Sequence, residues 1–93
     1  MDKIKAIRFR PGKWPELIDV ENTLEALQGQ VGGYIEVFPI NERAVAICNE
    51  EGRLLGLKPS VRILGETLVG TVLLVGRDGE EFTDIPKELE DLA

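Results

Sequence analysis

The fold of this chain is organised around one segment, Asn49-Glu50-Glu51-Gly52-Arg53-Leu54-Leu55-Gly56-Leu57-Lys58-Pro59-Ser60-Val61-Arg62. The segment separates the two most apolar stretches of the sequence, 43–48 and 68–75. It contains two glycines and a proline, and no acidic residue follows Glu51 within it. Glycine and proline restrict the backbone of a loop, and binding side chains are concentrated on such loops. We therefore expect this loop to present its basic residues to a partner.

The length and charge of the chain limit what it can be. Its 93 residues suit one domain, which we assign to residues 1–93, and 43% of them are hydrophobic, which is enough for a core. A domain of this size buries only about 60–65% of its unfolded surface, so we expect a homo-oligomer. The net charge of -6 argues against binding of duplex nucleic acid over the whole surface.

Missing residue types exclude several classes of chemistry. The chain has no histidine and one cysteine, Cys48, so it can form neither a Ser-His or Cys-His catalytic pair nor an intrachain disulfide. No run approaches the roughly 20 apolar residues of a membrane helix, and no signal peptide is visible. We expect a cytoplasmic protein with no cofactor, no metal site and no catalytic residues.

The first third of the chain predicts two strands and a helix. Charged and apolar residues alternate over 3–10, with a bulge or burial on both faces near Ala6-Ile7. A Pro-Gly turn follows, and 16–21 returns as an antiparallel strand. Asn22 stands three residues before Glu25, which is the spacing of a helix capping box, and a Gly-Gly pair ends the helix.

The remaining segments predict the rest of the sheet. Residues 34–40 read as a strand with Ile35 and Val37 inward. Pro39 marks an edge position or the end of the strand, because proline cannot donate to a ladder. The stretches 43–48 and 68–75 read as central strands because they are apolar on both phases. Further predicted elements are a short edge strand at 61–63, a bulge or close backbone approach at Gly70, a type I′ hairpin turn at Asp78-Gly79, and a helix over 84–92 capped by Thr83 or Asp84.

This order of elements predicts an α+β fold. We expect a mostly antiparallel sheet of about five to six strands with two short helices in a single domain. Adjacent acidic residues on a strand point to opposite faces, so the Glu-Glu pairs do not form an acid/base dyad by spacing alone. Cys48 lies in an apolar strand and is interpreted as part of the core.

The basic loop is the best candidate for a site. Its glycines do not match the phosphate-loop motif, which ends in Gly-Lys-Ser/Thr. Glycine-rich backbone and arginine can still bind an anion, and aromatic residues such as Trp14 and Tyr34 can stack on a base. The alternative is a structural crossover whose arginines pair with nearby glutamates. The candidate ligand-binding residues are Arg53, Lys58, Arg62, Asn49, Gly52, Gly56, Trp14 and Tyr34.

A set of short motifs spread over most of the chain is similar to one protein family. These are Pro11-Gly12-Lys13, 22–28, 31–36, 48–52 with Leu54, Gly56-Leu57, Pro59 and Arg62, Gly70-Thr71 and Phe82-Thr83. Together they resemble a family of short uncharacterised proteins of phages, plasmids and their bacterial hosts, a domain of unknown function found alone or beside anti-restriction proteins. The resemblance implies a mobile-element context, counter-defence, and the host cytoplasm if the protein is phage-encoded. It implies no reaction. Relatives carry an additional proline and an asparagine where Lys58 and Ser60 stand here.

These observations lead to one hypothesis and two alternatives. The leading hypothesis is a non-enzymatic binding module that sequesters a small anionic ligand of nucleotide type. The first alternative is a protein–protein inhibitor that places its acidic C-terminal surface on a host defence protein. The second is a small enzyme acting on nucleotides, which would need a metal held by Glu50, Glu51 or Glu66.

Overall fold

The structure is a computed structural model that describes residues 2–93. Eight strands, one α-helix and one 3₁₀ helix occur within these residues. In chain order they are β1 (Lys3–Phe9), β2 (Glu16–Glu21), α1 (Leu24–Val31), β3 (Ile35–Pro39), β4 (Ala44–Asn49), β5 (Pro59–Ile63), β6 (Glu66–Val69), β7 (Val72–Asp78), β8 (Glu81–Thr83) and the 3₁₀ helix η1 (Lys87–Leu92).

The strands form one large sheet and one small hairpin. The large sheet has the order β2-β1-β7-β4-β3, with β8 paired to β7, and every pairing in it is antiparallel. The hairpin consists of β5 and β6. The predicted α+β fold with a mostly antiparallel sheet and two short helices is therefore confirmed.

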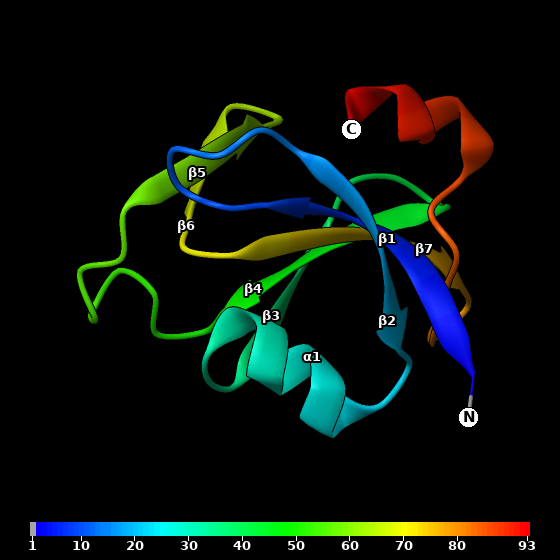
Figure 1. Cartoon of the computed structure of the whole chain (residues 1–93), viewed down its shortest axis with the longest axis horizontal. Coiled ribbons are helices and arrows are strands. Elements are labelled where there is room, and N and C mark those ends of the chain that lie inside the picture. The colour runs from blue at the N-terminus through cyan, green and yellow to red at the C-terminus, as the bar shows by residue number, and fades with distance from the viewer. Residues whose placement is uncertain (1) are drawn as a thin grey trace.

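Elements pack on both faces of the large sheet (Figure 1). Helix α1 covers one face, where Leu27 and Val31 join a core cluster with residues of β1, β2, β4 and β7. The β5–β6 hairpin and η1 cover the other face and complete a second cluster. Strand β1 contributes to both clusters, because Ala6 and its neighbour Ile7 are each fully buried on opposite faces. The predicted two-sided burial at these residues is confirmed.

The apolar stretch 68–75 is not one strand. It divides at Gly70 into the end of β6 and the start of β7, and only β7 is central. Gly70 has a φ of 72°, and a Cβ at this position would lie 2.7 Å from Cδ1 of Leu57. The prediction of a close backbone approach at Gly70 was correct. The single long strand was wrong because the chain leaves the sheet there to form the hairpin.

Both helix starts differ from the prediction. Thr23, and not Asn22, caps α1, because its hydroxyl accepts a hydrogen bond from the backbone N–H of Ala26 at 3.1 Å. The Asn22 amide instead donates to the carbonyl of Phe82. The C-terminal helix is a 3₁₀ helix whose N-cap residue is Pro86, and no side chain caps it. Gly32 ends α1 in the left-handed conformation, as predicted for the Gly-Gly pair.

Two further details correct the predicted strands. Val37 of β3 is 41% exposed and is not directed into a core. Gly79 has a positive φ, but its successor in the β7–β8 turn does not, so the turn has the pattern of type II′ and not type I′. Strand β3 does lie at an edge of the sheet, as Pro39 predicted.

Candidate functional site

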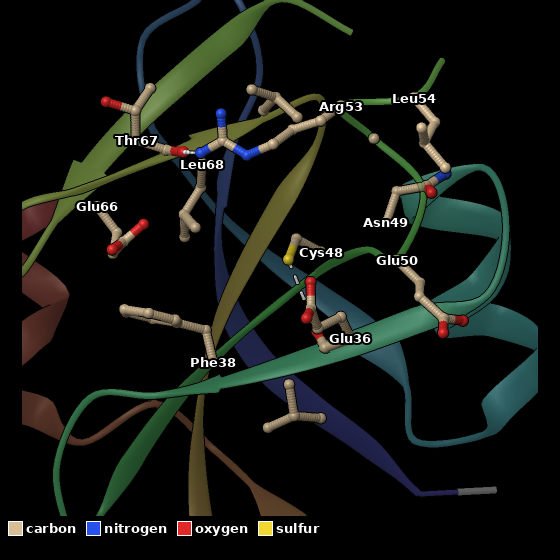
Figure 2. Close-up of a pocket in the computed structure, with 13 residues that line it drawn as sticks. Glu36, Phe38, Cys48, Asn49, Glu50, Arg53, Leu54, Glu66, Thr67 and Leu68 are labelled. Atoms are coloured by element: carbon tan, nitrogen blue, oxygen red, sulfur yellow. Dashed lines mark hydrogen bonds between the residues drawn. The ribbon is translucent and has the colours of Figure 1, made fainter. Parts of the chain in front are cut away.

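A polar cavity lies between the edge strand β3 and the β5–β6 hairpin. It has a volume of about 300 Å³, at the lower end of the range for small-molecule sites. Side chains from β3, from the end of β4, from the following loop and from β6 line it (Figure 2). The residues that line it include Glu36, Phe38, Cys48, Asn49, Glu50, Gly52, Arg53, Glu66, Thr67 and Leu68.

Arg53 is the cationic residue of this cavity. Its Nη2 donates to the backbone carbonyl of Thr67 at 2.7 Å, which ties the loop to β6 (Figure 2). A guanidinium carries five N–H donors, so this bond leaves donors for a ligand. No ion pair to Arg53 occurs within residues 2–93, where the pairs found are Arg8–Glu16, Arg10–Glu16 and Arg43–Glu88. The Arg53 charge is therefore available to an anion.

The cavity also contains carboxylates and an aromatic ring. Glu36 of β3, Glu50 of the loop and Glu66 of β6 all line it. The half-buried ring of Phe38 lies on the side of the cavity where Glu66 is found (Figure 2). These carboxylates form no ion pairs within the described residues. One cation next to several acceptors suits a ligand with one anionic group and separate N–H donors, and it does not suit a polyanion.

Cys48 faces the cavity but is not arranged as a nucleophile. Its thiol is buried and lies 3.8 Å from the carbonyl oxygen of Glu36, to which it donates. Burial, together with the Glu36 carboxylate, raises the pKa of the Cys48 thiol above its ordinary value of 9.0. A reactive cysteine needs the opposite shift. The interpretation of Cys48 as a core residue agrees with this environment.

The candidate residues from the sequence do not converge on one cavity. Arg53, Asn49 and Gly52 line the cavity described above. Lys58 lies in a shallow hollow with Pro11 and Gln30, and Arg62 lines an apolar cavity beneath η1. Tyr34 flanks a hollow next to the end of α1, while Trp14 is 90% exposed on the β1–β2 turn and Gly56 lies exposed in the loop.

The glycines of the loop do not offer a free cradle of N–H groups for an anion. Gly52 donates its N–H to the carbonyl of Asn49, Gly56 donates to Arg53, and Leu57 donates to Gly52. The loop is thus a series of closed turns, and its glycines serve these turns. A Cβ at Gly52 would lie 2.7 Å from Cγ2 of Val69, so close packing on β6 also requires glycine there.

Reasoning from the sequence missed Phe38 and Glu36, and it considered Glu66 only as a metal ligand or an ion-pair partner. These residues enter the site because the β5–β6 hairpin folds across the sheet and brings β6 opposite β3. The alternation on β3 places Glu36 and Phe38 on the same face, but nothing local indicates that β6 lies above that face. Long-range placement of the hairpin was the missing information.

Two further features of the described chain bear on function. Among residues 2–93, no three histidine, cysteine, aspartate or glutamate side chains gather closely enough to hold a metal ion. None of the helices in the same range has both the length and the apolar character needed to cross a membrane.

The fold and the cavity define a small α+β domain with a hairpin folded over an antiparallel sheet. Residues 4–93 match the family described as a domain of unknown function, DUF3846. The match covers nearly the whole chain, and the chain belongs to this family. No curated protein and no solved structure matches the chain.

Proposed function

We propose that this protein is a non-enzymatic binding module that sequesters a small anionic ligand of nucleotide type in the cavity between β3 and β6. The observation that carries the proposal is the Arg53 guanidinium, which is oriented by the Thr67 carbonyl and has no carboxylate partner in the described chain. A guanidinium that is oriented at a cavity and forms no direct ion pair is suited to a phosphate or carboxylate.

The other lining residues favour a ligand that also carries a base. The Phe38 ring offers an aromatic face, and the Glu36 and Glu66 carboxylates can accept hydrogen bonds from exocyclic amino groups. A volume of about 300 Å³ suits one mononucleotide unit better than an extended ligand. In this arrangement Phe38 takes the stacking role that the sequence suggested for Trp14 or Tyr34.

A role in sequestration, and not in turnover, agrees with the chemistry of the cavity. The pKa of the Cys48 thiol is raised, and the chain contains no histidine to act as a base near neutral pH. The resemblance to proteins of phages and plasmids favours a counter-defence role in the cytoplasm of a host cell. The exposed side chains of Tyr34, Leu54 and Leu64 favour a homo-oligomer, which native mass spectrometry would detect as a multiple of 10.3 kDa.

Calorimetry with nucleotides tests the proposal. We expect a mononucleotide or cyclic nucleotide to bind and to be recovered unchanged. At a ligand concentration of about 100 times Kd, binding stabilises the fold by about 2.7 kcal/mol, which raises Tm by roughly 10–20 °C in a domain of this size. Arg53→Ala should abolish the heat of binding, whereas Arg62→Ala, in the apolar cavity beneath η1, should leave it unchanged.

Three results would contradict the proposal. The first is an absence of heat with every linear and cyclic nucleotide. The second is an equal loss of binding in the two arginine variants. The third is conversion of the nucleotide in a reaction that stops when chelator is added, which would indicate an enzyme.

The acidic surface supports a second candidate, a protein–protein inhibitor. Asp78, Glu80, Glu81 and Asp91 are exposed, and no ion pair to them occurs within residues 2–93. Such a surface attracts a basic patch on a partner. Charge reversal at Glu80, Glu81 and Asp91 should then abolish salt-sensitive co-purification with a host protein, and Arg53→Ala should not affect it.

A further inference from the structure

The turn between β1 and β2 presents an aromatic side chain on a defined backbone. The N–H of Lys13 donates to the carbonyl of Arg10 at 3.1 Å, and Gly12 has a φ of 71° after Pro11. This is the pattern of a type II turn, in which proline and glycine fix both central residues. Trp14, the only tryptophan in the chain, follows directly and is 90% exposed.

The surroundings of this turn are basic although the whole chain has a net charge of -6. Arg10 and Lys13 belong to the turn, and Lys58 lies in a hollow of about 360 Å³ with Pro11. Arg8 on the adjoining strand donates to the Gln30 side chain, which lines the same hollow.

Glu16 is the acid that opposes these cations. Its Oε1 accepts hydrogen bonds from Arg8 at 3.2 Å and from Arg10 at 2.7 Å. Burial raises the pKa of Glu16, but the Arg10 and Arg8 guanidiniums outweigh that effect and hold the pKa below its ordinary value of 4.5. Glu16 therefore stays ionised near neutral pH and pairs with Arg8 and Arg10, while no ion pair to Lys13 or Lys58 occurs within residues 2–93.

We propose that this turn is a binding surface for single-stranded nucleic acid. Trp14 stacks on an unpaired base, while Arg10, Lys13 and Lys58 contact neighbouring phosphates. Proteins that bind single strands combine an aromatic platform with a cationic path for the backbone in this way. The surface is separate from the Arg53 cavity, because neither the turn nor Lys58 lines that cavity. The inference therefore does not rest on the proposed function.

The composition of the turn favours a single strand over a duplex or a membrane. A duplex keeps the faces of its bases stacked on one another, where Trp14 cannot reach them, and the acidic remainder of the protein opposes a long footprint. A membrane surface would require a wider apolar patch, but the neighbours of Trp14 are Lys13 and Pro15.

Because the chain has one tryptophan, its fluorescence reports on the proposed contact directly. We expect an oligothymidylate of about ten nucleotides to quench the emission of the full chain. Three phosphate contacts on a single strand predict a slope of about -2 for log K against log salt. Affinity should therefore fall roughly 20-fold between 50 and 200 mM salt.

Four variants separate stacking from charge, with a labelled oligothymidylate followed by anisotropy. Trp14→Leu should weaken binding roughly five- to hundredfold, and Lys13→Gln should make the salt slope shallower by about 0.7. Glu16→Gln should strengthen binding, because it releases two arginines from their shared carboxylate. Lys87→Gln on η1 is the matched control and should change nothing.

Three outcomes would overturn the proposal. In the first, the oligothymidylate does not quench the Trp14 emission, and its own anisotropy does not rise when the protein is added at 50 mM salt. In the second, Trp14→Leu binds as tightly as the unmodified chain, which excludes stacking. In the third, a duplex of equal length, or vesicles of phosphatidylserine and phosphatidylcholine, change the emission while the single strand does not.

Discussion

Asn49 holds two elements together through its side-chain amide. It is 6% exposed, and it is the one polar residue that is buried among residues 2–93. Its Nδ2 donates to the carbonyl of Val31 at the end of α1, and its Oδ1 accepts from the N–H of Glu51 at 2.7 Å. Because the backbone uses both ends of the amide, a structural role accounts for a residue that the sequence assigned to ligand binding.

We expect Asn49→Ala to lower the free energy of unfolding by about 1–3 kcal/mol, because the Val31 carbonyl and the partly buried N–H of Glu51 lose their partner. Urea denaturation measures the change. The matched control is Asn41→Ala, which removes a hydrogen bond to Arg43 at an exposed turn and should cost clearly less. Equal losses in the two variants would contradict this account of Asn49.

The buried thiol of Cys48 predicts a pH dependence of stability. Its pKa lies above the ordinary value of 9.0 in the folded chain, so the folded state keeps its proton at a pH where the unfolded state has lost it. Ionisation of Cys48 therefore leaves the free energy of unfolding unchanged below pH 9.0 and lowers it as the pH rises through the folded-state pKa. Urea midpoints measured from neutral pH to about pH 10 should fall more steeply for the unmodified chain than for Cys48→Val. Parallel curves would refute the prediction.

At the scale of elements, the junction between β6 and β7 depends on Gly70. Its positive φ and its contact with Leu57 both exclude a side chain. We expect Gly70→Ala to destabilise the fold by about 1–3 kcal/mol. Gly29→Ala is the control, since Gly29 lies within α1 with open space around it. This substitution should raise the free energy of unfolding by about 0.5–1 kcal/mol. Thermal unfolding of both variants tests the pair, and a shift of the same sign in both would contradict it.

Strand β3 leaves part of its backbone unpaired at the sheet edge. The N–H of Glu50 donates to the carbonyl of Tyr34, and the N–H of Ile40 donates to that of Ala44. The even-numbered residues of β3 therefore direct their backbone N–H and C=O groups toward β4. Ile35 and Val37 therefore turn their N–H and C=O groups outward. Pro39 and the charge of Glu36 limit association at this edge.

Removal of the Glu36 charge should allow the β3 edge to pair with another chain. We expect Glu36→Val to increase self-association, because β3 would then read as a neutral apolar strand. Light scattering as a function of protein concentration measures the effect. Glu25→Val, at an exposed position of α1, adds the same side chain away from the edge and should have little effect. Similar scattering from both variants would refute a specific role for β3.

The elements were easier to predict from the sequence than the site. The bounds of β2 were predicted to the residue, and the edge position of β3 followed from Pro39, because hydrophobic phase and turn residues are local signals. The cap at Thr23 was not resolved, since the neighbouring Asn22 could have served. The sequence placed an irregularity at Gly70 but not the division of 68–75 into two strands. The cavity was missed because the placement of β6 opposite β3 depends on tertiary packing. The separation of Arg53, Lys58 and Arg62 depends on packing as well.

At the scale of the whole molecule, the C-terminal segment is part of the fold. Ile85 is 3% exposed in the cluster beneath η1, and its N–H donates to the carbonyl of Lys5 on β1. Leu89 packs against the same cluster. The acidic residues at this end are therefore attached to a segment that the core requires.

Deletion of residues 84–93 should lower the free energy of unfolding by about 2–5 kcal/mol, because the cluster loses a buried isoleucine and its partly buried neighbour. Deletion of 91–93 alone removes only exposed residues and should cost little. Urea denaturation of both truncated chains measures the difference. If the longer deletion were harmless, the C-terminal segment would not belong to the core.

The strand order has a consequence for synthesis in the cell. Strand β7 lies between β1 and β4, so it joins the β1–β2 and β3–β4 hairpins that leave the ribosome before it. Translation adds about 5–20 residues per second, so β1 waits roughly 3–13 s for its central partner. During that interval the nascent chain exposes the unpaired edges of two apolar strands. We therefore expect chaperones to bind the nascent chain of a protein with this strand order.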